Sequence, residues 1–298
     1  MAKGWIDYWS NDFRPEKSGL WEQAISSQDI PLKVRGEKDD RAGQAPALLA
    51  RMNELGMQAI VLPSAPIPEL APANAYERFA TPPEEVVRLA QAHPGRFAGL
   101  ATIDPTLGQA GVENAGELLT KSGFVGLHLH THSWDRPFDD RDYYPYYALA
   151  AEHDVPVIMQ AGTSGGLMAS ECGQPIGIDR PALYFPKLRF VLSHTGWPWV
   201  DEAIAMAGKH ANVFLGTAAY PPHHWSASLV DFIRRAGRGK VLLGTSFPVV
   251  GHRQALGRLE GLGLGEEAHT ELLSGAARRV FRHWPGLPTP GNEEENSE

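Results

Sequence analysis

The sequence has a single cysteine, Cys172, among its 298 residues, which excludes an intramolecular disulfide and a Cys-rich zinc or iron–sulfur site. It has no run of about 18 apolar residues and no apolar leader, so we expect a cytoplasmic protein without membrane contact. Lys and Arg number 27 against 35 Asp and Glu, and the formal charge of −8 disfavours a nucleic-acid partner. No Gly-x-Gly-x-x-Gly motif follows the first predicted strand, so a dinucleotide-binding fold has no support.

The sequence does have a regular alternation of short apolar runs with longer segments of helical periodicity. This alternation predicts parallel strands, because parallel neighbours need crossover connections and helices supply them. Eight such units in about 280 residues favour an α/β fold with a single closed (β/α)8 barrel of the TIM type. The predicted strands are Trp5–Trp9, Met57–Leu62, Arg96–Ile103, Phe124–His130, Pro156–Gln160, Arg189–His194, Val213–Thr217 and Val241–Thr245.

The domain organisation follows from the same pattern. We expect one barrel domain over residues 1–284, with a final helix at Glu266–Phe281. Residues 285–298 are rich in Pro, Gly and Glu and contain no candidate core residues, so we predict a disordered acidic tail there.

Several short motifs are spread along the chain, and some of them stand at the predicted strand ends, where the active site of such a barrel lies. Together and in this order they resemble the amidohydrolase-related family, in particular the branch of aminocarboxymuconate-semialdehyde decarboxylase and the resorcylate-type decarboxylases. The resemblance implies a metal-binding (β/α)8 barrel that acts on small, often aromatic or unsaturated, carboxylic acids. The runs that carry it are Gly126–His130, Tyr146–Glu152, Ser193–Gly196, Trp199–Ala203, Asn212–Leu215 and Gly244–Pro248.

The metal-ligand positions that the resemblance assigns are occupied by other residue types. The family has Asp-x-His-x-His, or a Glu in place of the first His, on strand one; here Asp7 is followed by Trp9 and Asn11. Gln160 replaces a histidine on strand five, and Ser246 replaces an aspartate after strand eight. Zinc-type sites use imidazole, thiolate or carboxylate donors, which none of these four residues supplies. We therefore predict no bound catalytic metal and no other cofactor.

Three titratable residues are the candidates for catalysis. His194 lies in the intact motif on strand six, where the resemblance implies an acid/base residue, and a histidine can transfer protons without a metal. His130 shares one strand face with His128, and it is expected to face the site or to serve as a hydrogen-bonded structural residue. Asp7 is either an acid or base with a raised pKa or a structural hydrogen-bonding carboxylate. His132 is expected at the surface of the following loop.

The substrate-binding candidates are side chains at the same strand ends. Large aromatic residues there can stack on a planar substrate, or they can simply fill a dry barrel end. The expected set is Trp9, Asn11, Gln160, Ser246, Trp197 and His128.

Three functions remain open from the sequence. The first is a metal-independent enzyme of the decarboxylase or lyase type, which cleaves a C–C bond in a small planar acid with His194 as general acid/base. The second is a metal-free hydrolase of the lactonase or esterase type, in which Gln160 and Asn11 stabilise an oxyanion. The third is a non-catalytic barrel that binds a small ligand. The expected partner is a small-molecule substrate, and the resemblance implies a possible homodimer.

Overall fold

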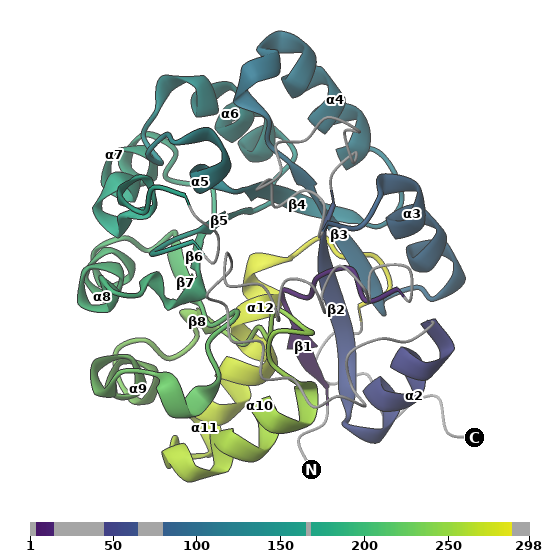
Figure 1. Ribbon diagram of the computed structural model, residues 1–298, viewed down its shortest axis with the longest axis vertical. Helices are drawn as coiled ribbons and strands as arrows, with labels where there is room; N and C mark the ends of the chain where they lie inside the picture. The colour runs from purple at the N-terminus through teal and green to yellow at the C-terminus, as the bar shows by residue number, and fades with distance from the viewer. Residues whose placement is uncertain (1–3, 15–44, 65–79, 165–167, 288–298) are drawn as a thin grey trace.

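The computed structural model describes residues 4–14, 45–64, 80–164 and 168–287. Its centre is a sheet of eight parallel strands that follow one another in chain order from β1 to β8. This is the predicted (β/α)8 barrel, with helices arranged around the outside of the strands (Figure 1). The strands are β1 Trp5–Asp7, β2 Met57–Ser64, β3 Phe97–Thr102, β4 Phe124–Leu129, β5 Val157–Gln160, β6 Phe190–Ser193, β7 Val213–Gly216 and β8 Val241–Leu242.

The helices of the described residues lie between successive strands, as the alternation predicts. The helix α9 begins after Ser226, whose hydroxyl accepts a hydrogen bond from the Leu229 backbone at 3.2 Å, as expected of a helix N-cap. The predicted final helix is present as α11, a π-helical segment at Glu271–Gly275, and α12. The bounds are α2 Ala45–Glu54, α3 Pro83–Ala92, α4 Gln109–Leu119, α5 Thr131–Trp134, α6 Tyr144–Glu152, α7 Asp179–Tyr184, α8 Val200–Lys209, α9 Ala227–Arg234, α10 His252–Leu259, α11 Glu266–Thr270 and α12 Ala276–Val280.

The barrel closes through the segments that follow β1 and β8 rather than through the two strands themselves. The Tyr8 backbone N–H donates to the Leu243 carbonyl at 3.2 Å, and the Ser246 N–H donates to the Trp9 carbonyl at 2.8 Å. Ser10 and Phe247 form a parallel bridge. The first and last strands are therefore joined at their carboxyl ends, where the family-like motifs lie.

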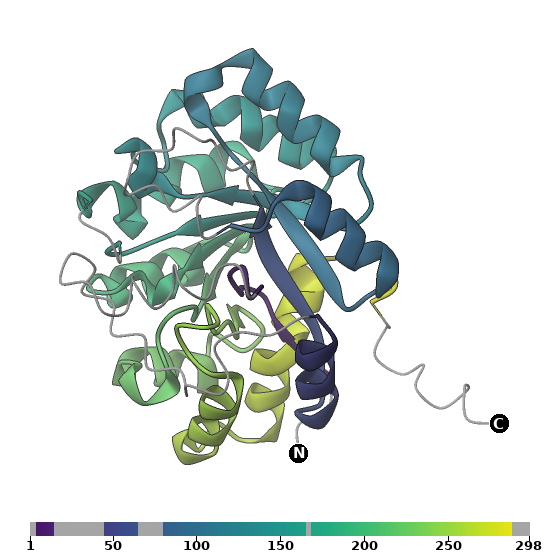
Figure 2. The ribbon, with the colours of Figure 1, turned by 45° about the vertical axis from the view of Figure 1, so that its right-hand side comes forward.

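Two apolar layers hold the barrel together. One cluster fills the space between the sheet and the surrounding helices. The other lines the barrel interior, and α12 contributes Ala276, Ala277 and Val280 to it. Figures 1 and 2 show this last helix beside β1 and β8, so it covers the inner apolar residues at that side of the barrel.

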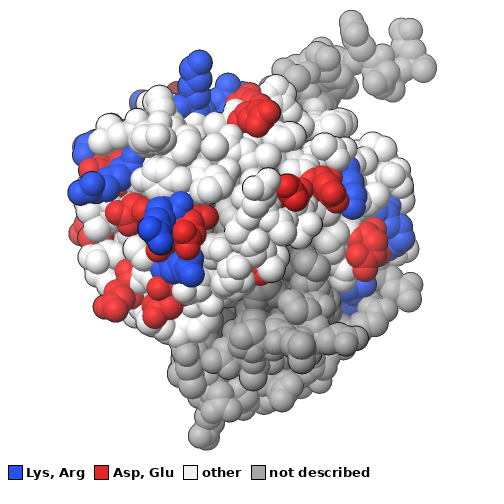
Figure 3. All heavy atoms as spheres, turned by 90° about the horizontal axis from the view of Figure 1, so that it is seen from above, with Lys and Arg blue, Asp and Glu red and all other residues white. Residues whose placement is uncertain are grey.

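The described surface carries charges of both signs (Figure 3), as the numbers of basic and acidic residues in the sequence indicate. In Figure 3, Lys and Arg side chains stand next to Asp and Glu over the described surface that is in view. Within the described ranges, the structure contains no helix of the length and apolar character needed to span a bilayer. Of the predicted acidic tail, residues 288–298 lie outside the part that the structure describes.

Candidate active site

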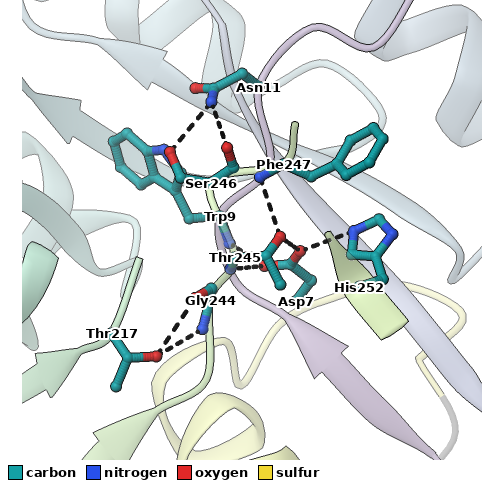
Figure 4. Close-up of polar contacts among 9 residues, drawn as sticks. All are labelled: Asp7, Trp9, Asn11, Thr217, Gly244, Thr245, Ser246, Phe247 and His252. Atoms are coloured by element: carbon teal, nitrogen blue, oxygen red, sulfur yellow. Dashed lines mark hydrogen bonds and ion pairs between the residues drawn. The ribbon is translucent and has the colours of Figure 1, made fainter. Parts of the chain in front are cut away.

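Asp7 connects the carboxyl end of β1 to the segment after β8. Its Oδ1 accepts hydrogen bonds from the backbone N–H groups of Trp9 at 3.2 Å and Thr245 at 3.0 Å. Its Oδ2 accepts a hydrogen bond from the Thr245 hydroxyl and lies 3.2 Å from His252 Nε2 (Figure 4). All of these groups are buried. The contacts favour the structural alternative for Asp7, because they commit both carboxylate oxygens to closing the barrel.

Asn11 and Ser246 make a second connection across the same junction. The Asn11 side-chain amide donates to the Ser246 carbonyl at 2.9 Å and to the Ser246 hydroxyl at 3.1 Å (Figure 4). Ser246 has a φ of 53°, a left-handed backbone conformation that costs a non-glycine residue about 1–3 kcal/mol. Such conformations persist where the surrounding structure determines them, and here the Asn11 amide and the Trp9 carbonyl hold both sides of Ser246.

Trp9 lies at the centre of a group of buried imidazoles. Its ring meets His128 edge-on at 4.7 Å and His194 at 5.4 Å between centroids. His130 extends the group, at 6.3 Å from His128 and 5.4 Å from His132. We call these five residues the Trp9–histidine cluster. Each of the five side chains is buried.

Burial lowers the pKa of every histidine in the cluster. Desolvation brings the pKa of His128 to about 3 and, with repulsion from His132 and His128, that of His194 to about 3. The pKa of His130 falls well below its ordinary value for the same reason, while a hydrogen bond with Gln160 opposes the shift. Burial also lowers the pKa of His132. The cluster is therefore a set of neutral imidazoles at neutral pH.

The His194 ring is hydrogen-bonded through Nδ1 to two hydroxyl groups in series. Its Nδ1 lies 2.9 Å from the Ser193 hydroxyl, which lies 2.6 Å from the Tyr8 hydroxyl. His194 and Thr195 have φ values of 64° and 58°, so two successive non-glycine residues adopt the left-handed conformation at the end of β6. This costly backbone turns the imidazole toward Trp9, and costly conformations of this kind gather at functional sites.

The structure brings together most of the predicted site residues. Gln160 ends β5, is buried, and hydrogen-bonds with His130. The exception is Trp197, which is 51% exposed, whereas the Trp9–histidine cluster is buried. Its role in substrate binding stays a prediction.

Three residues of this site were missed by the sequence interpretation. His132 was expected at the surface but is buried, with its Nε2 2.9 Å from the Gly162 carbonyl oxygen. The alternation of His128, His130 and His132 along the chain was the available signal, although α5 begins between the last two. Ser193 belongs to the Ser193–Gly196 motif and Tyr8 is one of the aromatic residues at the strand ends, but neither was predicted as a site residue, because the sequence does not show that their hydroxyl groups meet.

The side chains present do not fit the divalent metal ion that the resemblance implies. At the four ligand positions stand an indole, two amides and a hydroxyl, and the Asn11 amide is already bonded to Ser246. These groups are neutral and weaker ligands than imidazole or carboxylate. Over residues 4–14, 45–64, 80–164 and 168–287, no group of three or more His, Cys, Asp or Glu side chains is arranged to hold a metal ion.

Comparison with known proteins now identifies the family. A family model described as amidohydrolase matches residues 68–283, well over half of the chain. The chain belongs to the amidohydrolase family. The resemblance inferred from the sequence motifs is thus confirmed, while no curated protein matches the chain.

Solved structures show the same amidohydrolase barrel. An uncharacterised TIM-barrel protein from Bordetella bronchiseptica superposes with a TM-score of 0.71 at 21% identity, over 94% of this chain and 98% of the other. For 2,6-dihydroxybenzoate decarboxylase from Rhizobium the TM-score is 0.68 at 16% identity, over 94% and 99%. A dihydroxybenzoic acid decarboxylase from Polaromonas, with bound manganese and the inhibitor 2-nitroresorcinol, gives 0.64 at 16%, over 94% and 97%. These likenesses confirm the predicted fold.

Proposed function

We propose that this chain is a decarboxylase of the amidohydrolase family that cleaves a C–C bond in a small planar aromatic or unsaturated acid without a metal ion. The observation that carries the proposal is the edge-on packing of His194 against Trp9 at a buried strand end, where an indole, two amides and a hydroxyl occupy the positions of the family's metal ligands. Family membership and the decarboxylases among the similar structures support an enzyme of this type.

The reaction requires the protein to transfer one proton and to orient the planar acid. A proton is added to the ring carbon that carries the carboxylate, and a ring hydroxyl stabilises the resulting non-aromatic intermediate through the π-system. The bond between this carbon and the carboxylate then breaks, CO2 leaves, and the electron pair of that bond restores the aromatic ring. We assign the proton transfer to His194, and orientation of the planar acid to Trp9 and Gln160.

The electrostatics of the Trp9–histidine cluster suit an anionic substrate. The imidazoles are neutral because burial disfavours their charged form. A carboxylate that enters the cluster favours the charged form of a nearby imidazole and so raises its pKa. The substrate would thereby promote protonation of His194, the state from which an imidazole is an effective acid.

The test is a decarboxylation assay with hydroxybenzoates and unsaturated small acids, each with and without EDTA. We expect CO2 release that EDTA leaves unchanged and that His194→Gln lowers by about 10²-fold or more, because general acid catalysis contributes about that much. His153→Gln is the matched control, since His153 is exposed at the end of α6.

The other outcomes separate the alternatives. Activity that disappears with EDTA and returns with manganese would overturn the metal-free part of the proposal. Ester or lactone hydrolysis without CO2 release would show the hydrolase, and tight ligand binding without turnover would show the non-catalytic barrel. Equal losses in His194→Gln and His153→Gln would remove His194 from the mechanism.

A further inference from the structure

Tyr8, Ser193 and His194 form one continuous hydrogen-bonded chain inside the barrel. Tyr8 follows β1 and Ser193 ends β6. The hydrogen-bonded chain therefore joins two segments that are far apart in the sequence, across the barrel interior. The Tyr8 and Ser193 hydroxyl oxygens are 2.6 Å apart, and Ser193 Oγ is 2.9 Å from His194 Nδ1. Tyr8 and Ser193 are both 0% exposed, so water does not supply alternative partners.

The direction of the chain follows from counting hydrogens. The Tyr8 hydroxyl oxygen accepts a hydrogen bond from the Ala218 backbone N–H at 3.3 Å. It also accepts a hydrogen bond from the His194 backbone N–H. Among the described residues, the acceptor for the phenolic hydrogen is then Ser193 Oγ. Ser193 in turn must direct its own hydrogen to His194 Nδ1, because a hydrogen from Nδ1 would leave the serine hydrogen without an acceptor.

We propose that Tyr8 and Ser193 are positioning residues that hold His194 in the tautomer with its hydrogen on Nε2, the nitrogen left for a ligand. This inference rests on the proposed role of His194 and specifies it. In the resting protein His194 presents a hydrogen-bond donor to the substrate, which suits a carboxylate or a developing negative charge, and it does not present a proton acceptor.

Two glycines provide the space that Tyr8 needs. A Cβ atom at Gly216, the last residue of β7, would overlap the Tyr8 hydroxyl oxygen. A Cβ atom at Gly244 would overlap Cε1 of the same ring. Neighbouring strands thus leave a cradle for this one side chain, which fixes where its hydroxyl lies.

Tyr8 acts as a fixed donor rather than as an acid. Burial raises the pKa of its hydroxyl far above its ordinary value. The phenol therefore keeps its hydrogen throughout the pH range in which the protein is studied. Its contribution to His194 is orientation and choice of tautomer.

Nitrogen-15 NMR of histidine-labelled protein tests the tautomer without any substrate. We expect the His194 ring to show an unprotonated Nδ1 and a protonated Nε2, with the signal assigned by its disappearance in His194→Gln. Ser193→Ala and Tyr8→Phe should each give a mixture of tautomers, because Nδ1 loses its defined donor. Tyr147→Phe is the matched control, since the buried Tyr147 hydroxyl donates to the Phe138 carbonyl at 2.7 Å instead.

The outcomes decide the inference independently of turnover. A wild-type His194 with its hydrogen on Nδ1 would overturn it, even if both variants failed to fold. Folded Ser193→Ala with an unchanged single tautomer would do the same. If the tautomer is as expected but no acid is decarboxylated, the proposed function fails while the positioning role stands.

Where turnover is found, kinetics provide a second readout. Ser193→Ala and Tyr8→Phe should lower kcat by up to about 10²-fold with a smaller change in KM, as misplacement of a reacting group does. Tyr147→Phe should leave both constants unchanged. Loss of kcat in Tyr147→Phe as well would indicate a general effect of removing buried hydroxyls and would refute positioning by this chain.

Discussion

Mild acid should destabilise this barrel steeply, because its interior holds imidazoles that burial keeps neutral. The pKa of His128 and of His194 is lowered to about 3, from 6.5 for an ordinary histidine. Below pH 6.5 the unfolded chain therefore binds protons that the folded chain excludes. Stability is fully present above that pH and is lost as the pH falls toward the folded-state values.

The magnitude follows from proton linkage. Each such histidine costs about 1.4 kcal/mol of unfolding free energy per pH unit within this window, so the pair costs roughly 3 kcal/mol between about pH 6 and about pH 5. The shifts at His130 and His132 have the same direction and steepen the loss. Asp154, with its pKa lowered to about 2 by Arg189, loses its contribution only at lower pH.

Urea unfolding at several pH values measures the slope directly. His128→Phe keeps a planar ring beside Trp9 but cannot titrate, so the slope should fall by about 1.4 kcal/mol per pH unit. His153→Gln, at an exposed site, should keep the wild-type slope. A free energy of unfolding that stays constant between about pH 6 and about pH 5 would refute neutral burial of the cluster, as would equal slopes in His128→Phe and wild type.

Three further predictions concern the parts that support the site. Gly216→Ala should lower the free energy of unfolding by about 1–3 kcal/mol, because its Cβ displaces Tyr8. Gly208→Ala, whose Cβ meets no atom within 4 Å, should not lower it. Asp7→Asn places an amide N–H donor opposite the donor groups of Thr245. It should lower the free energy of unfolding in urea by about 1–3 kcal/mol. Normal kcat in the folded Asp7 variant would confirm a structural role, and its loss would favour catalysis. Ser226→Ala should cost about 1 kcal/mol through its lost helix cap, without any change in turnover.

The strands could be predicted well from the sequence because their apolar runs are short and clearly bounded. Each predicted strand begins at the observed first residue or one residue before it. The largest error is at the end of β8, predicted to Thr245 and observed to end at Leu242. There the apolar pattern continues, but the Leu243 carbonyl bonds to Tyr8 and its N–H donates to Leu272. Only the closed barrel creates these partners.

The sequence predicts where the site lies along the strands, but it does not predict the directions and contacts of the side chains. Strand ends identified His194, Trp9 and Gln160, because the carboxyl ends of parallel strands meet at one end of a barrel. Trp197 shares that location in sequence yet is 51% exposed, since position after a strand does not determine the direction of a side chain. The contact of Tyr8 with Ser193 joins residues 185 positions apart, and no local pattern reports such a pair.

The residues at the four ligand positions also determine the electrostatics of this end of the barrel. Around Trp9 the imidazoles are neutral at neutral pH, and the indole and the Gln160 amide carry no charge, while the Asp7 side chain bonds to Thr245 and to the Trp9 backbone. A lone buried charge costs several kcal/mol, so a neutral set is the stable state of this cluster before a ligand enters. In the proposed metal-free reaction, the carboxylate of the substrate is the first charge that enters the cluster, and its field favours protonation of a nearby imidazole.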